Sequence, residues 1–264
     1  MSTYVLVHGS WHGAWCWYKI VPRLEQAGHT VVALDLPSHG RDRTPPGDVS
    51  MADYVEAIGR VLDAADEPVV LVGHSRGGLA ITQAAEERPE KIRSLVYLAA
   101  FLIGDGETIL PLAFADTDSL IMPNLDVDQD AGWDMLRRDA FKATLYADCS
   151  EDDVALAHAL LTPEPSGPTN TPMRTTAQRF GRIPRVYIEL LQDRAVSPAL
   201  QRQMYTAMPC RKVLSIDASH SAYFSRPDEL ASKILHAGGD IYDLRSRQRC
   251  DENHQHIEDE MRDH

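Results

Sequence analysis

A serine between two glycines, where an aliphatic run meets an alanine-rich helix, constrains this chain more than any other feature. The run Val69–Val72 leads directly into Gly73, Ser75 and Gly77, which form the pattern Gly-x-Ser-x-Gly. In a strand–turn–helix context the serine takes a strained backbone conformation, and its hydroxyl points away from the sheet. Glycines are needed beside it because a Cβ there would collide with the neighbouring strand or helix. The pattern predicts that Ser75 is a nucleophile.

Elsewhere, short apolar runs alternate with segments of helical character. The strand-like runs cover residues 3–7, 30–35, 68–73, 92–99, 185–190 and 211–216, and the helical segments cover about 15–27, 51–65, 76–87, 198–208 and 227–237. Ser50 and Ser197 each begin a pattern typical of a helix N-cap. This alternation predicts an α/β fold, with a doubly wound, mostly parallel sheet and helices on both faces. The near-continuous apolar strands fit burial on both sides.

The alternation breaks between residues 101 and 182. This stretch contains glycines, an acidic run, a helical segment near residues 134–146 and a turn-rich proline segment. Because structureless loops of this length are rare in compact domains, we expect a cap, or lid, inserted in the C-terminal half of the core. The core is then expected to comprise residues 1–100 and 183–239, followed by a polar C-terminal tail at 240–264.

Composition limits the class of protein. The 264 residues are 44% apolar, which suffices for one substantial core. No apolar run is long enough to span a membrane, and the strand-like start leaves no room for a signal peptide, so we expect a cytoplasmic protein. A formal net charge of −13 argues against nucleic acid as a partner. The four cysteines are scattered, which favours reduced thiols.

A serine hydroxyl is a poor nucleophile at neutral pH and needs a base that a third group orients. In sheets of this type the order along the chain is serine, then acid, then histidine. Asp193 directly follows one late strand-like run and His220 follows the next, so we assign them as acid and base. Asp217 is the second candidate for the acid. It shares a loop with His220, which makes it less able to approach the far side of the ring.

An acyl-transfer site also needs an oxyanion hole made of two backbone N–H groups. One should belong to Arg76, the residue after the nucleophile. The other should belong to Ser10, in the glycine-containing loop 8–13 that follows the first strand. His12 of this loop either faces the substrate pocket or holds the loop in place.

Three aromatic residues are candidates for the walls of the substrate pocket. Phe101 and Tyr223 lie next to the serine and histidine loops, and Trp133 lies in the expected cap. The triad chemistry itself requires no metal or cofactor. His254 and His256 in the tail form too weak a pattern to predict a metal site.

With these residues in place, the chain resembles the α/β-hydrolase superfamily and, within it, the plant methylesterase and hydroxynitrile lyase family. The resemblance runs from Tyr4 to about His236. The stretches that carry it are VLVHGSWHGAWCWYK (5–19), AGHTVVALDL (27–36), VGHSRGG (72–78), CSEDDVALA (149–157), RFG (179–181) and QDRAVSP (192–198).

The resemblance implies that Ser75 is the nucleophile, that Asp193 rather than Asp217 is the acid and that His220 is the base. It also implies a mostly helical cap and is compatible with a homodimer. Arg76 departs from the family, since an apolar residue is usual directly after the nucleophile.

Two positions bear on the reaction. The lyases resemble one another in having a threonine at the position of Gly9 and a lysine at that of Ser221, and this sequence has neither. The sequence therefore predicts a serine carboxylester hydrolase that acts on a small to medium ester through an acyl-enzyme. The alternatives are a carbon–carbon lyase on the same triad and a non-catalytic receptor for a small ligand.

Overall fold

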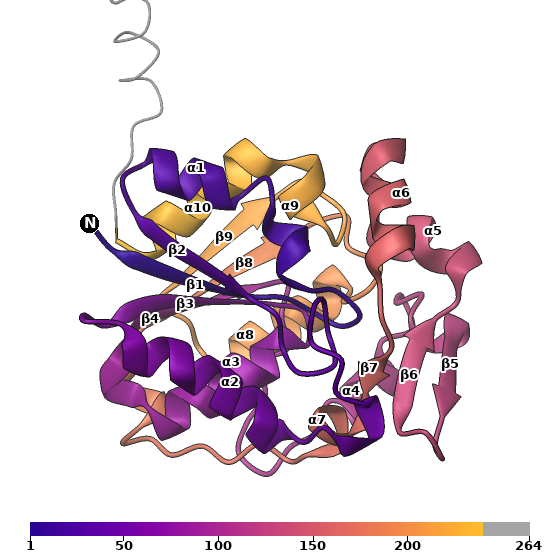
Figure 1. Ribbon diagram of the computed structural model, residues 1–264, viewed down its shortest axis with the longest axis horizontal. Helices are drawn as coiled ribbons and strands as arrows, with labels where there is room; N and C mark the ends of the chain where they lie inside the picture. Colours follow the sequence, from indigo (N-terminus) through magenta and orange to yellow (C-terminus); the bar gives the residue numbers. More distant parts are fainter. Residues whose placement is uncertain (240–264) are drawn as a thin grey trace, which may run out of the picture.

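The computed structural model describes residues 1–239 and has a central parallel sheet of six strands (Figure 1). The sheet order is β2-β1-β3-β4-β8-β9, and every neighbouring pair is parallel. The strands are β1 (Thr3–Val7), β2 (Thr30–Leu34), β3 (Val69–His74), β4 (Ile92–Leu98), β8 (Arg185–Leu190) and β9 (Lys212–Ile216). Each matches an expected strand to within one residue at either end. The α/β fold class predicted from the sequence is confirmed.

Helices cover both faces of this sheet, as Figure 1 shows. On one face lie α1 (Val21–Gln26), α9 (Ala222–Ser225) and α10 (Pro227–Ala237), and on the other lie α2 (Met51–Ala64), α3 (Gly77–Glu87) and α8 (Pro198–Ala207). Successive side chains along a strand pack alternately into the two core layers, one on each face of the sheet. Tyr4 and Leu6 pack with one face, while Val5 and Val7 pack with the other. Burial on both faces explains why the central strands β1, β3 and β4 are near-continuous apolar runs.

The helix starts follow the local sequence signals. Ser50 caps α2 in a reciprocal capping box with Asp53, and the Ser197 hydroxyl accepts the Leu200 N–H at the start of α8. The helix expected over 15–27 is instead a 3₁₀ turn followed by the short helix α1. The 3₁₀ turns of the described chain are Ala14–Trp17, Pro46–Asp48, Pro89–Lys91, Met122–Asn124, Arg138–Ala140 and Phe180–Arg182.

The segment between β4 and β8 contains a second, smaller sheet as well as helices. Its antiparallel strands, in the order β5-β6-β7, are β5 (Leu125–Asp128), β6 (Trp133–Leu136) and β7 (Glu164–Pro165). Its helices are α4 (Leu110–Ala115), α5 (Phe141–Leu145), α6 (Glu151–Leu160) and α7 (Ser166–Asn170). The helix expected near 134–146 was therefore wrong in its first part. Residues 133–136 pair with β5 through a tight turn at Gly132, whose φ is +69°.

We refer to residues 101–182 as the cap. Within the described part of the chain, none of the helices combines the length and apolar character that crossing a membrane requires. Cys16, Cys149 and Cys210 are free thiols. Cys250 and the tail histidines His254 and His256 lie outside the described residues.

Candidate active site

Ser75 lies in a sharp turn between β3 and α3. Its φ is +53°, in the left-handed region, which is strained for a residue with a side chain. The turn is held because the Ser75 N–H donates to the Leu98 carbonyl at 3.2 Å and the Ser75 carbonyl accepts from the Phe101 N–H at 3.0 Å. A Cβ at Gly77 would lie 2.4 Å from the His8 carbonyl oxygen, so only glycine fits there. This is the geometry that the Gly-x-Ser-x-Gly pattern predicts.

The structure brings His220 and Asp193 together at the carboxyl ends of β9 and β8. The His220 Nδ1 lies 2.7 Å from the Asp193 Oδ2, and both side chains are buried. Because a carboxylate only accepts, Nδ1 carries the proton and Nε2 is left free to accept one. The His220 backbone is held as well, since the His74 Nε2 donates to its carbonyl at 3.0 Å. Ser75 and His220 line the same cavity.

Asp217, the second candidate for the acid, does not contact the His220 ring. Its Oδ1 accepts from the Gln192 Nε2 at 2.9 Å, and the side chain faces solvent. On the same loop, the Ser219 hydroxyl and N–H both donate to Asp148. The geometry therefore favours Asp193 as the partner of His220.

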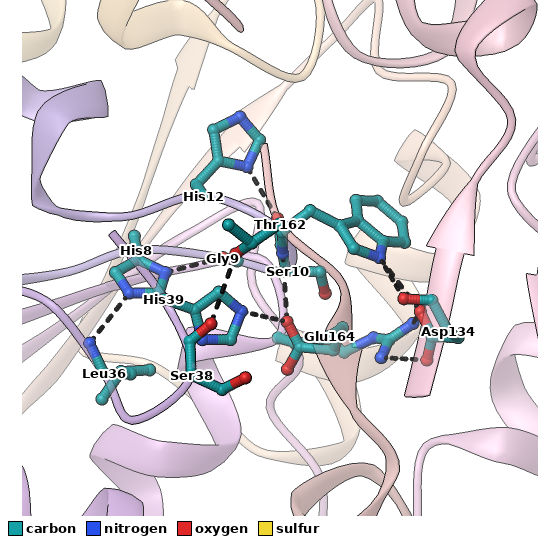
Figure 2. Close-up of polar contacts among 12 residues, drawn as sticks. His8, Gly9, Ser10, His12, Leu36, Ser38, His39, Asp134, Thr162 and Glu164 are labelled. Atoms are coloured by element: carbon teal, nitrogen blue, oxygen red, sulfur yellow. Dashed lines mark hydrogen bonds and ion pairs between the residues drawn. The ribbon is translucent and has the colours of Figure 1, made fainter. Parts of the chain in front are cut away.

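The loop after β1 carries Ser10, which lines this cavity. The Ser10 N–H belongs to the same planar peptide as the Gly9 carbonyl, so fixing the carbonyl orients the N–H. The His8 Nδ1 donates to that carbonyl at 2.8 Å, and the His8 Nε2 accepts from the Leu36 N–H at 3.1 Å (Figure 2). Burial lowers the pKa of His8 to about 4, which keeps the ring neutral in this arrangement.

Ser10 and Arg76 both line the cavity that contains Ser75. Across residues 1–239, neither of their backbone N–H groups has a protein acceptor. The loop and the serine turn are also in close contact, because a Cβ at Gly9 would lie only 2.7 Å from the Ser75 Cβ. Two unpaired N–H groups beside a serine are the arrangement that an oxyanion hole requires.

His12 does not line the cavity, which corrects its expected place in the substrate pocket. Its Nδ1 donates to the Ser10 carbonyl at 2.7 Å (Figure 2), and its Nε2 accepts from the hydroxyls of Tyr146 and Tyr223 at 2.7 and 3.0 Å. Burial lowers the pKa of His12 to about 3. This neutral, fully bonded ring has the structural role that was the alternative for it.

The cavity above Ser75 has a volume of about 400 Å³ and a largely apolar wall. Phe101 is part of that wall, as expected. Trp133 is not, because it lies on β6 beside a separate surface hollow formed with residues 126–130. Tyr223 is not either, because it is fully buried beneath the loop, against His12 and Ser221. Most of the other apolar lining residues belong to helix α4, its N-cap and the cap segments that follow it: Ile109, Leu110, Ala113, Phe114, Ile121, Met122, Leu125 and Val127.

The Arg76 side chain is buried against the cap. Its Nη1 and Nη2 lie 2.7 and 3.0 Å from the two carboxylate oxygens of Asp134 on β6, and its Nη1 also donates to the Thr169 hydroxyl at 2.9 Å. Burial alone would lower the pKa of Arg76, but Asp134 and Glu164 together raise it. Sequence analysis missed Asp134. The one signal that pointed to it was the unusual arginine after the nucleophile, which required a buried partner.

Glu164 on β7 is the second residue that sequence analysis missed. One of its oxygens accepts from the Trp11 N–H at 3.1 Å and contacts the His39 Nε2 at 3.0 Å (Figure 2), and the other accepts from the Tyr54 hydroxyl at 3.2 Å. Burial by itself would raise the pKa of Glu164, but His39 and Arg76 outweigh it and lower the pKa to about 2. Glu164 therefore joins the cap to the core as an ionised carboxylate.

Comparison with known proteins gives matches over most of the chain. A family model described as the alpha/beta hydrolase family matches residues 4–233. Methylesterase 9 of Arabidopsis thaliana is 34% identical over 252 residues, which cover 89% of this chain and 97% of that protein. Salicylic acid-binding protein 2 of Nicotiana tabacum is 32% identical over 247 residues, covering 88% of this chain and 95% of that protein. The crystal structure of polyneuridine aldehyde esterase matches with a TM-score of 0.81 at 28% identity, covering 89% of this chain and 98% of that one.

Proposed function

The chain is a carboxylesterase of the alpha/beta hydrolase family, in the group that includes the plant methylesterases, and we propose that it hydrolyses its ester through Ser75, His220 and Asp193. One observation carries the proposal. His220, whose Nδ1 lies 2.7 Å from the Asp193 carboxylate, lines the same cavity as Ser75 and as Ser10 and Arg76, the residues with the two unpaired N–H groups.

The reaction follows from these positions. The Ser75 Oγ attacks the ester carbonyl while the His220 Nε2 takes its proton, and the resulting oxyanion accepts hydrogen bonds from the Ser10 and Arg76 N–H groups. Asp193 orients the ring and stabilises its charged form. His220 then gives the proton to the leaving alcohol, and the acyl group stays on Ser75. Water, deprotonated by His220, attacks this acyl-enzyme and releases the carboxylic acid.

We further propose that the substrate is a small to medium ester with an apolar acyl group. The cavity volume of about 400 Å³ and the apolar side chains of its wall support this choice. Arg76 also lines the cavity, but Asp134 binds both Nη atoms of its guanidinium, so this charge is already paired and is not available to bind a substrate carboxylate. Methyl esters are the first class to test, because several relatives are named as methylesterases.

The test is hydrolysis of p-nitrophenyl esters from acetate to decanoate, together with methyl esters of aromatic and aliphatic acids. Wild type is compared with Ser75→Ala and with a matched control, Ser232→Ala, on α10 outside the cavity. We expect a preferred acyl length, no activity in Ser75→Ala and unchanged activity in the control.

Activity that survives Ser75→Ala would overturn the proposed nucleophile. If no ester is hydrolysed, release of cyanide from mandelonitrile would instead indicate the lyase reaction. Tight binding of a small ligand without turnover would indicate a receptor.

A further inference from the structure

Two separate segments, the loop 8–13 and the serine turn, carry the proposed oxyanion donors, and both are tied to one carboxylate of the cap. From the serine turn, the Arg76 guanidinium binds both oxygens of Asp134. From the loop, the Trp11 Nε1 donates to the Asp134 Oδ1 and to its carbonyl oxygen, each at 3.1 Å. Trp11 directly follows Ser10 in the chain, so each tie lies at or next to a donor residue.

The tie between Arg76 and Asp134 is buried and geometrically constrained. The Arg76 and Asp134 side chains are only 11% and 7% exposed. A bidentate arginine–carboxylate pair fixes the relative orientation of its two planar groups as well as their distance. The Arg76 guanidinium also lies 5.5 Å above the Trp11 ring, so the three side chains form one packed unit.

The backbone of Trp11 is held by the cap on both sides. Its N–H donates to the Glu164 Oε2 at 3.1 Å, and its carbonyl accepts from the Thr162 N–H at 2.9 Å. Its φ is +64°, a left-handed conformation that a tryptophan adopts only when its surroundings impose it. Asp134 and Glu164 pair directly across β6 and β7, so both ties reach the loop from one small sheet.

We propose that Asp134 is a positioning residue for catalysis, which sets the separation of the Ser10 and Arg76 N–H groups by holding Trp11 and the Arg76 side chain together. This inference rests on the proposed function, because it assumes that the two N–H groups receive the oxyanion. An oxyanion hole needs both donors 2.7–3.1 Å from one oxygen. A misplacement of about 1 Å in a reacting site lowers the rate by roughly 100-fold. The ground-state ester makes weaker demands on this spacing, so the loss should fall on kcat.

The test compares Asp134→Asn with Asp126→Asn, a matched control on the neighbouring strand β5 with an exposed carboxylate. For the best ester substrate, we expect kcat of Asp134→Asn to fall by about 10- to 100-fold while KM changes by less than about threefold. The control should keep both values.

A second readout separates positioning from general damage to the cavity. An alkyl trifluoromethyl ketone forms a tetrahedral adduct with the serine, and the oxyanion of this adduct occupies the oxyanion hole. Binding of the carboxylic acid product does not require the oxyanion hole. In Asp134→Asn the affinity for the ketone should fall by the same factor as kcat/KM, and the affinity for the acid should stay unchanged. Equal weakening of ketone, acid and substrate would overturn the inference, as would an unchanged kcat.

Two further variants keep the test decisive. If Asp134→Asn fails to fold, Trp11→Phe removes the Nε1–H donor while keeping an aromatic ring, and it should lower kcat and ketone affinity together by about 3- to 10-fold. An unchanged kcat in Trp11→Phe would then overturn the inference. Ser75→Ala in the same assay tests the proposed function separately. Ester hydrolysis that survives this substitution would overturn Ser75 as the nucleophile, whereas the effect of Asp134→Asn is measured independently of it.

Discussion

Asp193 holds the His220 ring with one oxygen and its own loop with the other. Its Oδ2 lies 2.7 Å from the ring Nδ1, while its Oδ1 accepts from the N–H groups of Ala195 and Val196 at 2.7 and 3.0 Å. The Gln201 Nε2 also donates to Oδ2 at 3.4 Å, so the carboxylate cannot rotate away without breaking four hydrogen bonds. Its position reflects the sheet, since β8 and β9 are neighbours and end at the same edge.

Replacing Asp193 by asparagine should lower kcat by about 10³- to 10⁴-fold, because an amide no longer stabilises the Nδ1–H form of the ring or its charged state. KM should change little. Asp217→Asn is the matched control, since that carboxylate contacts Gln192 instead of His220, and its kcat should stay within about threefold of wild type. Steady-state kinetics of both variants decides the assignment, and a larger loss in Asp217→Asn would reverse it.

His8→Leu should impair both stability and rate. The substitution leaves the Leu36 N–H and the Gly9 carbonyl without their buried partner, which costs about 1–3 kcal/mol of unfolding free energy. Because the Gly9 carbonyl belongs to the peptide that carries the Ser10 N–H, we expect kcat to fall by about tenfold at constant KM. Urea unfolding and steady-state kinetics measure the two effects. A destabilised enzyme with full kcat would show that His8 does not orient the Ser10 N–H.

His12 should make the fold sensitive to mild acid. Its pKa is about 3 in the folded protein against 6.5 for the free side chain, so the unfolded chain binds the extra proton between these values. The stability that His12 contributes is therefore present above pH 6.5 and is lost as pH falls toward 3, by up to about 1.4 kcal/mol per pH unit. His12→Gln cannot titrate, so its deficit relative to wild type should shrink as pH falls. Urea unfolding of both proteins at pH 7.5, 6, 5 and 4 measures it, and a deficit that is constant over this range would contradict the prediction.

Glu164 should contribute stability in a lower pH window. Its pKa falls from 4.5 to about 2 on folding, so the contribution is complete above pH 4.5 and is lost as pH falls toward 2. Glu164→Gln should be less stable than wild type by at most about 3 kcal/mol at pH 7. The difference should begin to close only below pH 4.5. Thermal unfolding between pH 7 and pH 3 tests this, and a difference already closing between pH 7 and 5 would assign the effect to another group.

The core was predictable because its signals are local. The expected boundaries of β8 and α10 match the structure residue for residue, since β8 is a mostly apolar run and α10 begins at a proline. Ser75, Asp193 and His220 could be selected for the same reason, as each follows such a run. Strand order then brings Asp193 and His220 together with no further information.

The cap could not be predicted in the same way. Strand β6 is four residues long, and Asp134 within it is paired with Glu164, which is remote in the sequence. A single carboxylate in so short a strand has the appearance of a surface residue until its partner is known, and Arg76 was the partner that sequence analysis left unexplained. Tyr223 and Trp133 failed as pocket walls because nearness to a loop in sequence does not determine the side on which a ring packs.

The attachment of the cap divides the walls of the cavity into two kinds. On the side of β6 and β7, Asp134 and Glu164 join the cap to the core through buried charged groups, so a substitution there disturbs the catalytic loop. On the side of α4, Leu110 and Phe114 present apolar side chains to the cavity. The end of α4 is also joined to the loop after Asp193, because the Asp116 carboxylate accepts from the Ser197 N–H at 2.9 Å. A substitution at Leu110 or Phe114 can therefore change the shape of the cavity without removing a hydrogen bond to a catalytic loop, whereas one at Asp116 cannot. At those apolar positions, the substrate range of this enzyme can evolve separately from its rate of reaction.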